Sequence, residues 1–597
     1  MRVADAVGRE LAGLGASTVF GVVGSGNFHV TNALIAGGAR FIAARHEGGA
    51  TVMADAWART TGVPGVVTVH QGPGLTNAMT GIAEAAKSRT PLLVLAAEAP
   101  DARSNFYVDV AGLAAAVGAV AMRLHSPASA LADAHRAYQA SLGRRTVILA
   151  LPLDVQAAQC EPGEQGEPGE PGRRPAPRRA YPAGLAAQAG LAAQAGPPAS
   201  AGLAASAGPP APAAEAVTAL AGVLRGARRP VFIAGRGARG KSAELERLAD
   251  LCGALLATSA VAKGLFGGSP WNLDISGGFA SPLTAELISD ADVIVGWGCS
   301  LNMWTTRHGK LIGPGATLVQ VDDDAGAIGA HRPVHLGVPG DVAETARAVA
   351  ACLAGDEGAL VGEPEAVREK DNGGTPGTAG YRSARLRERI ARQVRWRDVG
   401  YADDGDGQHI DPRTLSITLD DMLPAERTVA VDSGNFMGYP SMYLSVPDEA
   451  GFCFTQAFQS IGLGLASAIG AAIARPDRLA VAALGDGGAL MGISELETIV
   501  RLKIPMVVVV YDDAAYGAEV HHFGPDGDSL DTVRFPPADI AAIARGFGFE
   551  GITVRQAADL GAVRDWVEGP RERPLLIDAK VTSARGSWWL EEAFRGH

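Results

Sequence analysis

The chain is poor in cysteine, and its few cysteines are scattered. Only five occur in 597 residues. No two of them have the C-x-x-C spacing that is typical of zinc sites or redox motifs. We therefore expect neither a disulfide framework nor a cysteine-based zinc site.

Long apolar runs and an excess of basic residues are also missing. No apolar run reaches the roughly 20 residues that a membrane-spanning helix needs. Residues 1–5 lead directly into an amphipathic helical pattern, without the apolar core of a signal peptide. The formal net charge of −12 argues against nucleic acid as a standing partner. We expect a soluble, cytoplasmic protein that binds neither membranes nor nucleic acid.

Apolar residues are plentiful, at 47% of the sequence, which is enough for several buried cores. Short apolar runs alternate with helical patterns in three regions, and this alternation is typical of doubly wound parallel sheets. The sequence thus predicts the α/β class with three such domains. Residues 160–213 are rich in Pro, Gly and Ala and predict a linker, and residues 355–401 predict a polar connector. The domains are expected at residues 1–159, 214–354 and 402–597.

Two acidic turns follow neighbouring apolar runs in the last domain. Residues 479–484 predict a buried strand that ends in the motif GDGG at 485–488. A helical pattern over residues 490–502 then leads to a second strand at 504–510, which ends in Asp512-Asp513. Carboxyl ends of parallel strands meet at one edge of the sheet, where ligands bind. Two carboxylates there predict a Mg²⁺ ion shared with a phosphate-bearing ligand, whose phosphates the glycine backbone can approach.

The spacing of these turns resembles that of the thiamine-diphosphate enzymes, whose signature is GDG followed by a pair of asparagines. Asp513 follows Asp486 by 27 positions, which suits the family. The resemblance implies that Asp486 and Asp513 bind Mg²⁺ through their side chains and Ala515 through its carbonyl. Asp512 and Asp513 replace the asparagine pair, and the second carboxylate adds negative charge beside a diphosphate.

The resemblance also implies a set of cofactor-binding residues. The loop after the strand at 428–432 helps to hold the diphosphate in the family, and Ile461 lies where relatives place an apolar wedge that bends the cofactor. A core isoleucine is the alternative for Ile461. The residues assigned to the cofactor are Asn77, Gly434, Asn435, Phe436, Ile461, Gly485, Gly487, Gly488 and Tyr516.

Glu47 is the leading catalytic candidate. A glutamate at a helix start is often only a favourable partner of the helix dipole. However, Arg-His-Glu-Gly-Gly-Ala at 45–50 resembles the family motif whose glutamate touches the aminopyrimidine ring. That ring must gain and lose a proton at N1′, and a buried carboxyl group suits this relay.

Two further loops contain candidate catalytic and substrate-binding residues. The motif GPGLTN at 72–77 follows His70 and resembles a loop of acetolactate synthases, and Thr76 or Asn77 is expected to cap the next helix. Ser25 and His70 match the positions of an active-site serine and histidine in benzoylformate decarboxylase, although His70 also suits an ordinary turn. Gln71, His521 and His522 are candidates for the substrate pocket, over which residues 588–590 are expected to close.

The middle domain contains a glycine-rich turn at 235–242 that matches both the Rossmann and the P-loop patterns. A P-loop enzyme also needs a strand that ends in a Mg²⁺-binding Asp, and Asp322 is a weak candidate. In flavin-containing members of the resembled family, this domain holds the adenosine of FAD. FAD is therefore a further candidate cofactor, but residues 298–304 depart from the flavin-contacting arginine motif, which disfavours it.

The order of the three domains resembles the family order of pyrimidine-binding, middle and diphosphate-binding domains. The family pairs the first domain of one subunit with the last domain of another, which implies a homodimer or homotetramer. The leading hypothesis is an acetolactate-synthase-like carboligase that decarboxylates a 2-oxo acid and joins the resulting enamine to a second carbonyl. The alternatives are a 2-oxo acid decarboxylase of the benzoylformate type and a catalytically degenerate nucleotide-binding or regulatory protein.

Overall fold

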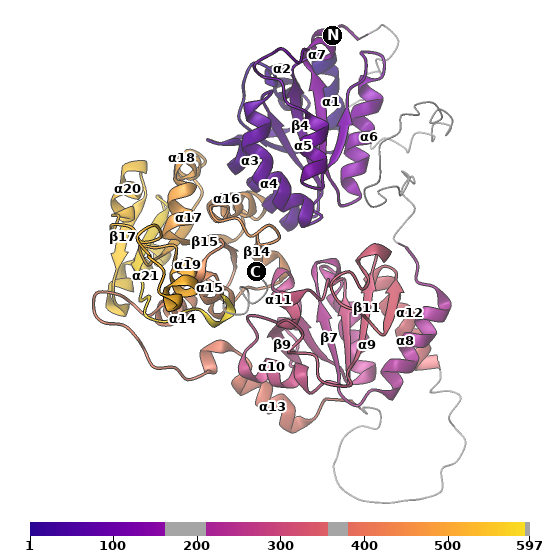
Figure 1. Cartoon of the computed structure of the whole chain (residues 1–597), viewed down its shortest axis with the longest axis vertical. Coiled ribbons are helices and arrows are strands. Elements are labelled where there is room, and N and C mark those ends of the chain that lie inside the picture. Colours follow the sequence, from indigo (N-terminus) through magenta and orange to yellow (C-terminus); the bar gives the residue numbers. More distant parts are fainter. Residues whose placement is uncertain (161–209, 356–379, 591–597) are drawn as a thin grey trace, which may run out of the picture.

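The computed structural model describes residues 1–160, 210–355 and 380–590. This part of the chain forms three sheets of six strands each (Figure 1). The strand pairs within every sheet are parallel, which confirms the expected α/β class. Most of the expected linker at 160–213 and of the connector at 355–401 lies outside the described residues.

The amino-terminal sheet has the strand order β2-β1-β3-β4-β6-β5. The chain winds outward in opposite directions from β1 and β3, so the loops after these two strands flank the switch point where open α/β sheets bind ligands. The strands are β1 Thr18–Gly21, β2 Arg40–Ala43, β3 Gly65–Val69, β4 Leu92–Glu98, β5 Val120–Arg123 and β6 Thr146–Pro152. The helices are α1 Val3–Leu14, α2 Phe28–Ala36, α3 Glu47–Thr61, α4 Pro73–Lys87, α5 Val110–Ala116, α6 Ala130–Leu142 and α7 Leu153–Ala157.

The middle sheet repeats this plan with the order β12-β11-β10-β7-β8-β9 and has its switch point between β7 and β10. Its strands are β7 Pro230–Ala234, β8 Leu255–Thr258, β9 Asn272–Ile275, β10 Val293–Trp297, β11 Thr317–Asp322 and β12 Leu336–Pro339. Its helices are α8 Ala214–Gly226, α9 Ser242–Cys252, α10 Pro282–Ser289, α11 Met303–Thr306 and α12 Val342–Gly355. The helix α13 Ala384–Gln393 follows in the connector.

The carboxyl-terminal sheet has the order β14-β13-β15-β16-β18-β17, with the switch point between β13 and β15. Its strands are β13 Arg427–Val431, β14 Phe452–Phe454, β15 Leu479–Gly485, β16 Met506–Asp512, β17 Glu550–Val554 and β18 Leu575–Lys580. Its helices are α14 Pro412–Met422, α15 Gly438–Tyr443, α16 Gly464–Ala474, α17 Asp486–Met491, α18 Leu496–Arg501, α19 Gly517–Phe523, α20 Ile540–Phe547 and α21 Gly561–Glu568. The central strands β15 and β16 are buried along almost their whole length, as their apolar runs require.

Two local expectations are wrong. The helical pattern at 490–502 is broken into α17, a short 3₁₀ turn at Ile493–Glu495, and α18. Thr76 and Asn77 do not cap α4, because this helix already begins at Pro73. Proline fits the first helical position, since its missing N–H has no partner there.

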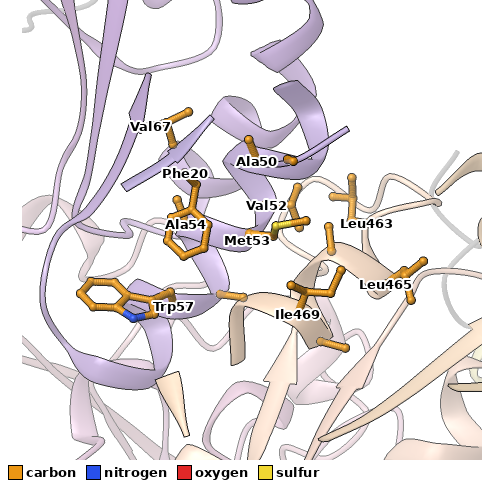
Figure 2. Packing of buried hydrophobic residues seen from close by; sticks show 14 of the residues in the cluster. Phe20, Ala50, Val52, Met53, Ala54, Trp57, Val67, Leu463, Leu465 and Ile469 are labelled. Carbon is orange, nitrogen blue, oxygen red and sulfur yellow. The ribbon is translucent and has the colours of Figure 1, made fainter. Parts of the chain in front are cut away.

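One apolar core joins the amino-terminal and carboxyl-terminal sheets. Helix α3 packs on α16, and Val52, Met53 and Trp57 lie in the same cluster as Leu463 and Ile469 (Figure 2). A Cβ atom on Gly470 would lie 2.1 Å from the carbonyl oxygen of Met53, so the glycine is needed for this close approach.

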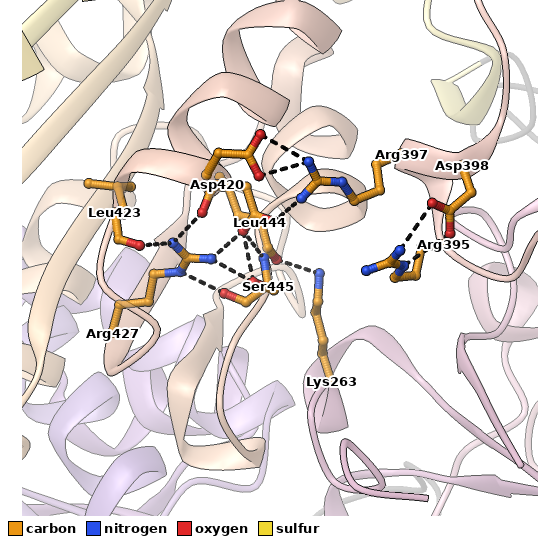
Figure 3. A network of polar contacts seen from close by, with 10 residues as sticks. Lys263, Arg395, Arg397, Asp398, Asp420, Leu423, Arg427, Leu444 and Ser445 are labelled. Carbon is orange, nitrogen blue, oxygen red and sulfur yellow. Dashed lines mark hydrogen bonds and ion pairs between the residues drawn. The ribbon is translucent and has the colours of Figure 1, made fainter. Parts of the chain in front are cut away.

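The middle and carboxyl-terminal sheets are joined by a polar network (Figure 3). The buried ammonium group of Lys263 donates to the carbonyl oxygen of Leu444 at 2.8 Å. Arg427 pairs with Asp420 nearby and donates to the carbonyl oxygen of Ser445 at 2.8 Å. Burial lowers the pKa of Lys263.

None of the helices in the described ranges is long and apolar enough to cross a membrane.

Candidate active site

Three loops of the carboxyl-terminal sheet meet at its switch point. Strand β15 pairs with both β13 and β16, so the residues that follow these strands share one edge of the sheet. The three loops are residues 432–437, 485–488 and 513–517. They include most of the residues that the sequence assigned to the cofactor and metal.

Asp486 and Asp513 form the centre of this edge. Asp486 is the first residue of α17 and is only 7% exposed. Burial and the neighbouring Asp513 raise the pKa of Asp486 above its usual range, and burial and Asp512 raise that of Asp513. Two carboxyl groups that crowd each other in this way have a high affinity for a cation or a proton. No cluster of three or more His, Cys, Asp or Glu suited to a metal occurs in the described ranges, so a metal would need further oxygen ligands.

Asp512 lines the same pocket as Asp486 but has its own counter-ion. Its carboxylate forms a buried ion pair with Lys580 and accepts the N–H of Ala514 at 2.9 Å. Lys580 also contacts Asp578 at 3.0 Å. The lysine reaches Asp512 because the two residues are partners in the register of β16 and β18. Lys580 could not be predicted as a site residue from the sequence, because no local pattern links it to Asp512.

The glycines of this edge allow the loops to approach one another closely. A Cβ atom on Gly488 would lie 2.2 Å from the carboxylate of Asp432, and one on Gly517 would lie 2.3 Å from that of Asp513. Gly487 lies against the ring of Tyr516, and Gly485 against that of Phe436. A Cβ atom at any of these four positions would force the facing side chain to move.

Asp432 holds the loop that precedes α16. Its carboxylate accepts the N–H groups of Gly462 at 3.0 Å and Leu463 at 3.2 Å, directly after the half-buried Ile461. It also accepts the N–H of Ser433 at 2.8 Å. Burial raises the pKa of Asp432 to about 6 despite these bonds. The sequence predicts Asp432 only as the last residue of a strand. The structure adds its role in holding the loop before α16.

The loop at 434–437 contains one buried polar atom that forms no hydrogen bond with the described residues. The side-chain oxygen of Asn435 is buried and has no hydrogen-bond partner among the described residues. The carbonyl oxygen of Asn435 is held by Ser587 at 2.9 Å and by the indole of Trp589 at 3.2 Å. Trp589 is 2% exposed and packs against Gly438. The tail therefore supports this loop from within the core, and the expectation that residues 588–590 form a cover is wrong.

A pocket of about 300 Å³ opens beside the acidic pair. Its lining residues are Asp486, Gly487, Leu490, Met491, Asp512, Ala514, Tyr516, Phe535, Pro536 and Ala538. His521 and His522 lie on the next helix, α19. The Nε2 atom of His521 is buried and has no partner among the described residues, and burial lowers the pKa of this imidazole. His522 packs against Phe523.

The amino-terminal sheet gathers the other candidates at its own switch point. Glu47 is the first residue of α3, and its Oε2 atom accepts the side-chain N–H of Asn77 at 3.0 Å. His70 accepts the N–H of Gly26 at 3.2 Å, which places the exposed Ser25 in the loop beside its ring. Gln71 is buried against the same loop, near Gly26.

The start of α3 rests on the carboxyl-terminal sheet of the same chain. The N–H groups of Arg45 and His46 donate to Oε1 of Glu495 at 3.0 and 3.1 Å. Glu495 follows Asp486 by nine positions and is 2% exposed. The segment that contains Glu47 is thus fixed to the unit that contains Asp486. The sequence gives no signal for Glu495, since it lies within an ordinary helical pattern.

Three family models match the chain in sequence order. They are the N-terminal TPP binding domain of thiamine pyrophosphate enzymes at residues 1–137, the central domain at 217–349 and the C-terminal TPP binding domain at 432–579. The chain is a thiamine pyrophosphate enzyme. The expected family is confirmed, and so is the expectation of an enzyme that is similar to acetolactate synthases.

Curated relatives of this thiamine pyrophosphate enzyme have several activities. Sulfoacetaldehyde acetyltransferase of Alcaligenes xylosoxydans xylosoxydans is 26% identical, over 92% of this chain and 87% of the relative. The probable 2-ketoarginine decarboxylase of Pseudomonas aeruginosa is 28% identical, over 93% and 89%. Acetolactate synthase isozyme 2 large subunit of Escherichia coli is 24% identical, over 99% and 97%. These relatives are named as transferases, synthases and decarboxylases.

Proposed function

We propose that this enzyme uses thiamine diphosphate and Mg²⁺ to decarboxylate a 2-oxo acid and to join the remaining fragment to a second carbonyl compound. The observation that carries the proposal is the crowded pair of Asp486, which is buried, and Asp513, which is partly buried, beside the switch point of the carboxyl-terminal sheet. Mg²⁺ would neutralise this pair and bind the diphosphate. Because Lys580 neutralises Asp512, the replacement of the family's asparagine pair adds only one uncompensated carboxylate.

The residues around the pair suit the cofactor. Asp486, Asp513 and the carbonyl of Ala515 would hold Mg²⁺. The side-chain N–H of Asn435 and the backbone N–H groups of Gly434, Gly487 and Gly488 would donate to the diphosphate. Ile461, Phe436, Gly485 and Tyr516 would contact the rings or support the turn. We propose residues 1–159 as the pyrimidine-binding domain, 214–354 as the middle domain and 402–597 as the diphosphate-binding domain.

Bound thiamine diphosphate supplies a nucleophilic carbon that adds to the 2-oxo acid and accepts the electrons released with CO₂. Glu47 would hold the proton that the aminopyrimidine N1′ gains and loses. Asn77 donates to Oε2 of Glu47 and so fixes the orientation of its carboxyl group. Asp432 would hold Ile461 under the cofactor through the N–H groups of Gly462 and Leu463.

We further propose that the active site is shared between subunits of a homodimer or homotetramer, as in the family. Mixing two inactive variants, Glu47→Gln and Asp486→Asn, tests this arrangement. A shared site predicts that mixed dimers regain up to about a quarter of the activity, since half of the molecules are mixed and one of their two sites is intact. If Glu47 and Asp486 of the same chain serve one cofactor, exchange of subunits restores nothing.

The alternative reaction is decarboxylation without ligation. It is favoured by the loop that places Ser25 beside His70, and by the relative named as a 2-ketoarginine decarboxylase. Product analysis with pyruvate, alone and with an added aldehyde, distinguishes the two. A carboligase forms a new hydroxyketone or acetolactate-type product, whereas a decarboxylase releases an aldehyde. Gln71 and His521 are candidate contacts of the substrate.

The glycine-rich turn of the middle domain supports a packing role better than FAD or nucleotide binding. A Cβ atom on Gly235 would lie 2.3 Å from the carbonyl oxygen of Gly298, so the neighbouring loop already fills the switch point. Lys241 pairs with Asp341 at 2.5 Å.

Calorimetric titration of the purified chain with thiamine diphosphate, with and without Mg²⁺, is the first experiment on the proposed function. An absence of binding under both conditions overturns the proposed function.

A further inference from the structure

The contact between the amino-terminal and carboxyl-terminal sheets is reciprocal. Glu495 of the carboxyl-terminal unit accepts two backbone N–H groups just before α3, at Arg45 and His46. On the other side, Glu84 of α4 accepts two N–H groups from the loop that precedes α16. Its Oε1 atom accepts the N–H of Ala457 at 3.2 Å, and its Oε2 atom that of Phe458 at 2.7 Å.

Glu84 belongs to a buried cluster of charges. Arg59 donates to Glu84 at 2.8 Å and pairs with Asp55 at 2.7 Å. The side chains of Asp55 and Glu84 are fully buried, and that of Arg59 is 6% exposed. Burial by itself would raise the pKa of Glu84, but Arg59 and the N–H of Phe458 bring it below the usual value. The carboxylate is therefore ionised at neutral pH and makes charge-assisted hydrogen bonds.

Arg59 holds a second point on the same loop. Its guanidinium donates to the carbonyl oxygen of Phe454, at the end of β14, at 3.1 Å. Arg236 of the middle sheet donates to the carbonyl of Ser88, so all three sheets meet at this cluster. The loop is thus anchored at residues 454, 457 and 458 from outside its own sheet.

The far end of the loop is held from within its own sheet. Asp432 accepts the N–H groups of Gly462 and Leu463. Residues 459–461 therefore lie between two buried carboxylates, Glu84 on one side and Asp432 on the other. Gln459 has a φ of +62°, a strained conformation for a residue other than glycine, which persists only where the surroundings enforce it.

We infer that Glu84 is a positioning residue for the cofactor site, which it serves by fixing residues 457–458 and thereby the tripeptide that ends in Ile461. The inference rests on the proposed function, in which Ile461 lies under thiamine diphosphate. Glu84 acts across the interface between two domains of one chain. Cofactor binding is consequently coupled to the docking of the amino-terminal domain.

The test compares Glu84→Gln with Asp55→Asn, a matched variant that removes a carboxylate from the same buried cluster without touching the loop. Calorimetry measures the Kd for thiamine diphosphate at saturating Mg²⁺, and urea denaturation measures stability. We expect both variants to lose similar stability, while only Glu84→Gln weakens cofactor binding, by about tenfold for the lost charge-assisted bonds. Equal Kd values in the two variants would show that Glu84 is merely structural.

Hydrogen exchange of the cofactor-free chain gives a second readout that does not depend on the reaction. The amides of Ala457 and Phe458 should exchange at least tenfold faster in Glu84→Gln than in the parent, and at the parent rate in Asp55→Asn. Unchanged protection in Glu84→Gln contradicts the inference. If Glu84→Gln does not fold, Glu84→Asp keeps the charge beside Arg59 but is too short for the loop, and the same results are expected of it.

The outcomes separate this inference from the proposed function. A parent chain that binds no thiamine diphosphate overturns both. A parent that binds the cofactor, with Glu84→Gln and Glu84→Asp that bind it equally well, overturns only the role of Glu84.

Discussion

Two glycine-rich turns flank the switch points of different sheets of this chain. One follows β15 at 485–488, and the other follows β7 at 235–241. The first leaves Asp486 crowded against Asp513, with a pocket beside it. In the second, the loop at Gly298 fills the space, and Lys241 is paired with Asp341. We therefore propose that a glycine-rich turn at a switch point serves as a ligand site only where the neighbouring loop leaves its polar groups without partners.

The largest effect on turnover should come from removing the carboxyl group of Glu47, which lies in the amino-terminal domain and is proposed to act on the cofactor bound at the turn after β15. Glu47→Gln keeps the shape of the side chain but cannot exchange a proton with the cofactor, so turnover should fall by about 10² to 10⁴-fold. Steady-state rates, with calorimetry to show that thiamine diphosphate still binds, measure this effect. Glu10→Gln on α1 is the matched surface control. Undiminished turnover in Glu47→Gln would remove the catalytic assignment.

The counter-ion of Asp512 should matter next. Lys580→Met leaves the buried carboxylates of Asp512 and Asp578 without their cation, so the free energy of unfolding should fall by about 3 kcal/mol. Urea denaturation measures this loss. Adding Asp512→Asn to Lys580→Met removes one unpaired charge and should restore part of the stability. A single variant as stable as the parent would show that the ion pair contributes nothing.

Asp513→Asn restores the charge pattern that the family has at this turn. The variant should bind thiamine diphosphate at least as tightly as the parent, because a negative charge beside the diphosphate is lost. Metal binding should weaken, so the variant should depend more strongly on added Mg²⁺. Cofactor titrations at several Mg²⁺ concentrations check both expectations. Loss of cofactor at every Mg²⁺ concentration would mean that Asp513 makes a contact that an amide cannot replace.

The acidic pair should also make the effect of Mg²⁺ depend on pH. Both carboxyl groups have a raised pKa in the folded chain, so their protonated forms favour folding at low pH and this contribution is lost as pH rises above about 4. Mg²⁺ competes with these protons. Thermal unfolding should therefore show a larger Mg²⁺-induced stabilisation at pH 7 than at pH 5. Stabilisation that is equal at both pH values, or that persists in Asp486→Asn, would contradict this account.

The smallest effect is expected at the second turn. Lys241→Ala removes a partly buried ion pair with Asp341, which should cost about 1 kcal/mol of stability and leave turnover unchanged. ATP should not raise the melting temperature of the parent. Saturable ATP binding that is lost in Lys241→Ala would show that this turn, too, is a ligand site.

Much of the fold could be predicted because its signals are local. The apolar run at 479–484 became β15 Leu479–Gly485, within one residue of the expected limits. The edge at which Asp486 and Asp513 meet follows from the rule that parallel strands share their carboxyl ends. The break between α17 and α18 was missed, since the apolar positions at 490–502 continue without interruption. Thr76 was assigned as a cap because its residue type suits one, although Pro73 begins the helix earlier.

The order of residues along the chain sets which residues follow each strand, and thus the 27-residue spacing of Asp486 and Asp513 and the glycines between the loops. Which charges have partners depends on the folded arrangement of the three sheets. Lys580 neutralises Asp512 through the register of β16 and β18, and Glu84 reaches Ala457 from another sheet. The physical reason is that strand register and domain docking are set by packing between segments far apart in the chain. A local pattern carries no information about that packing.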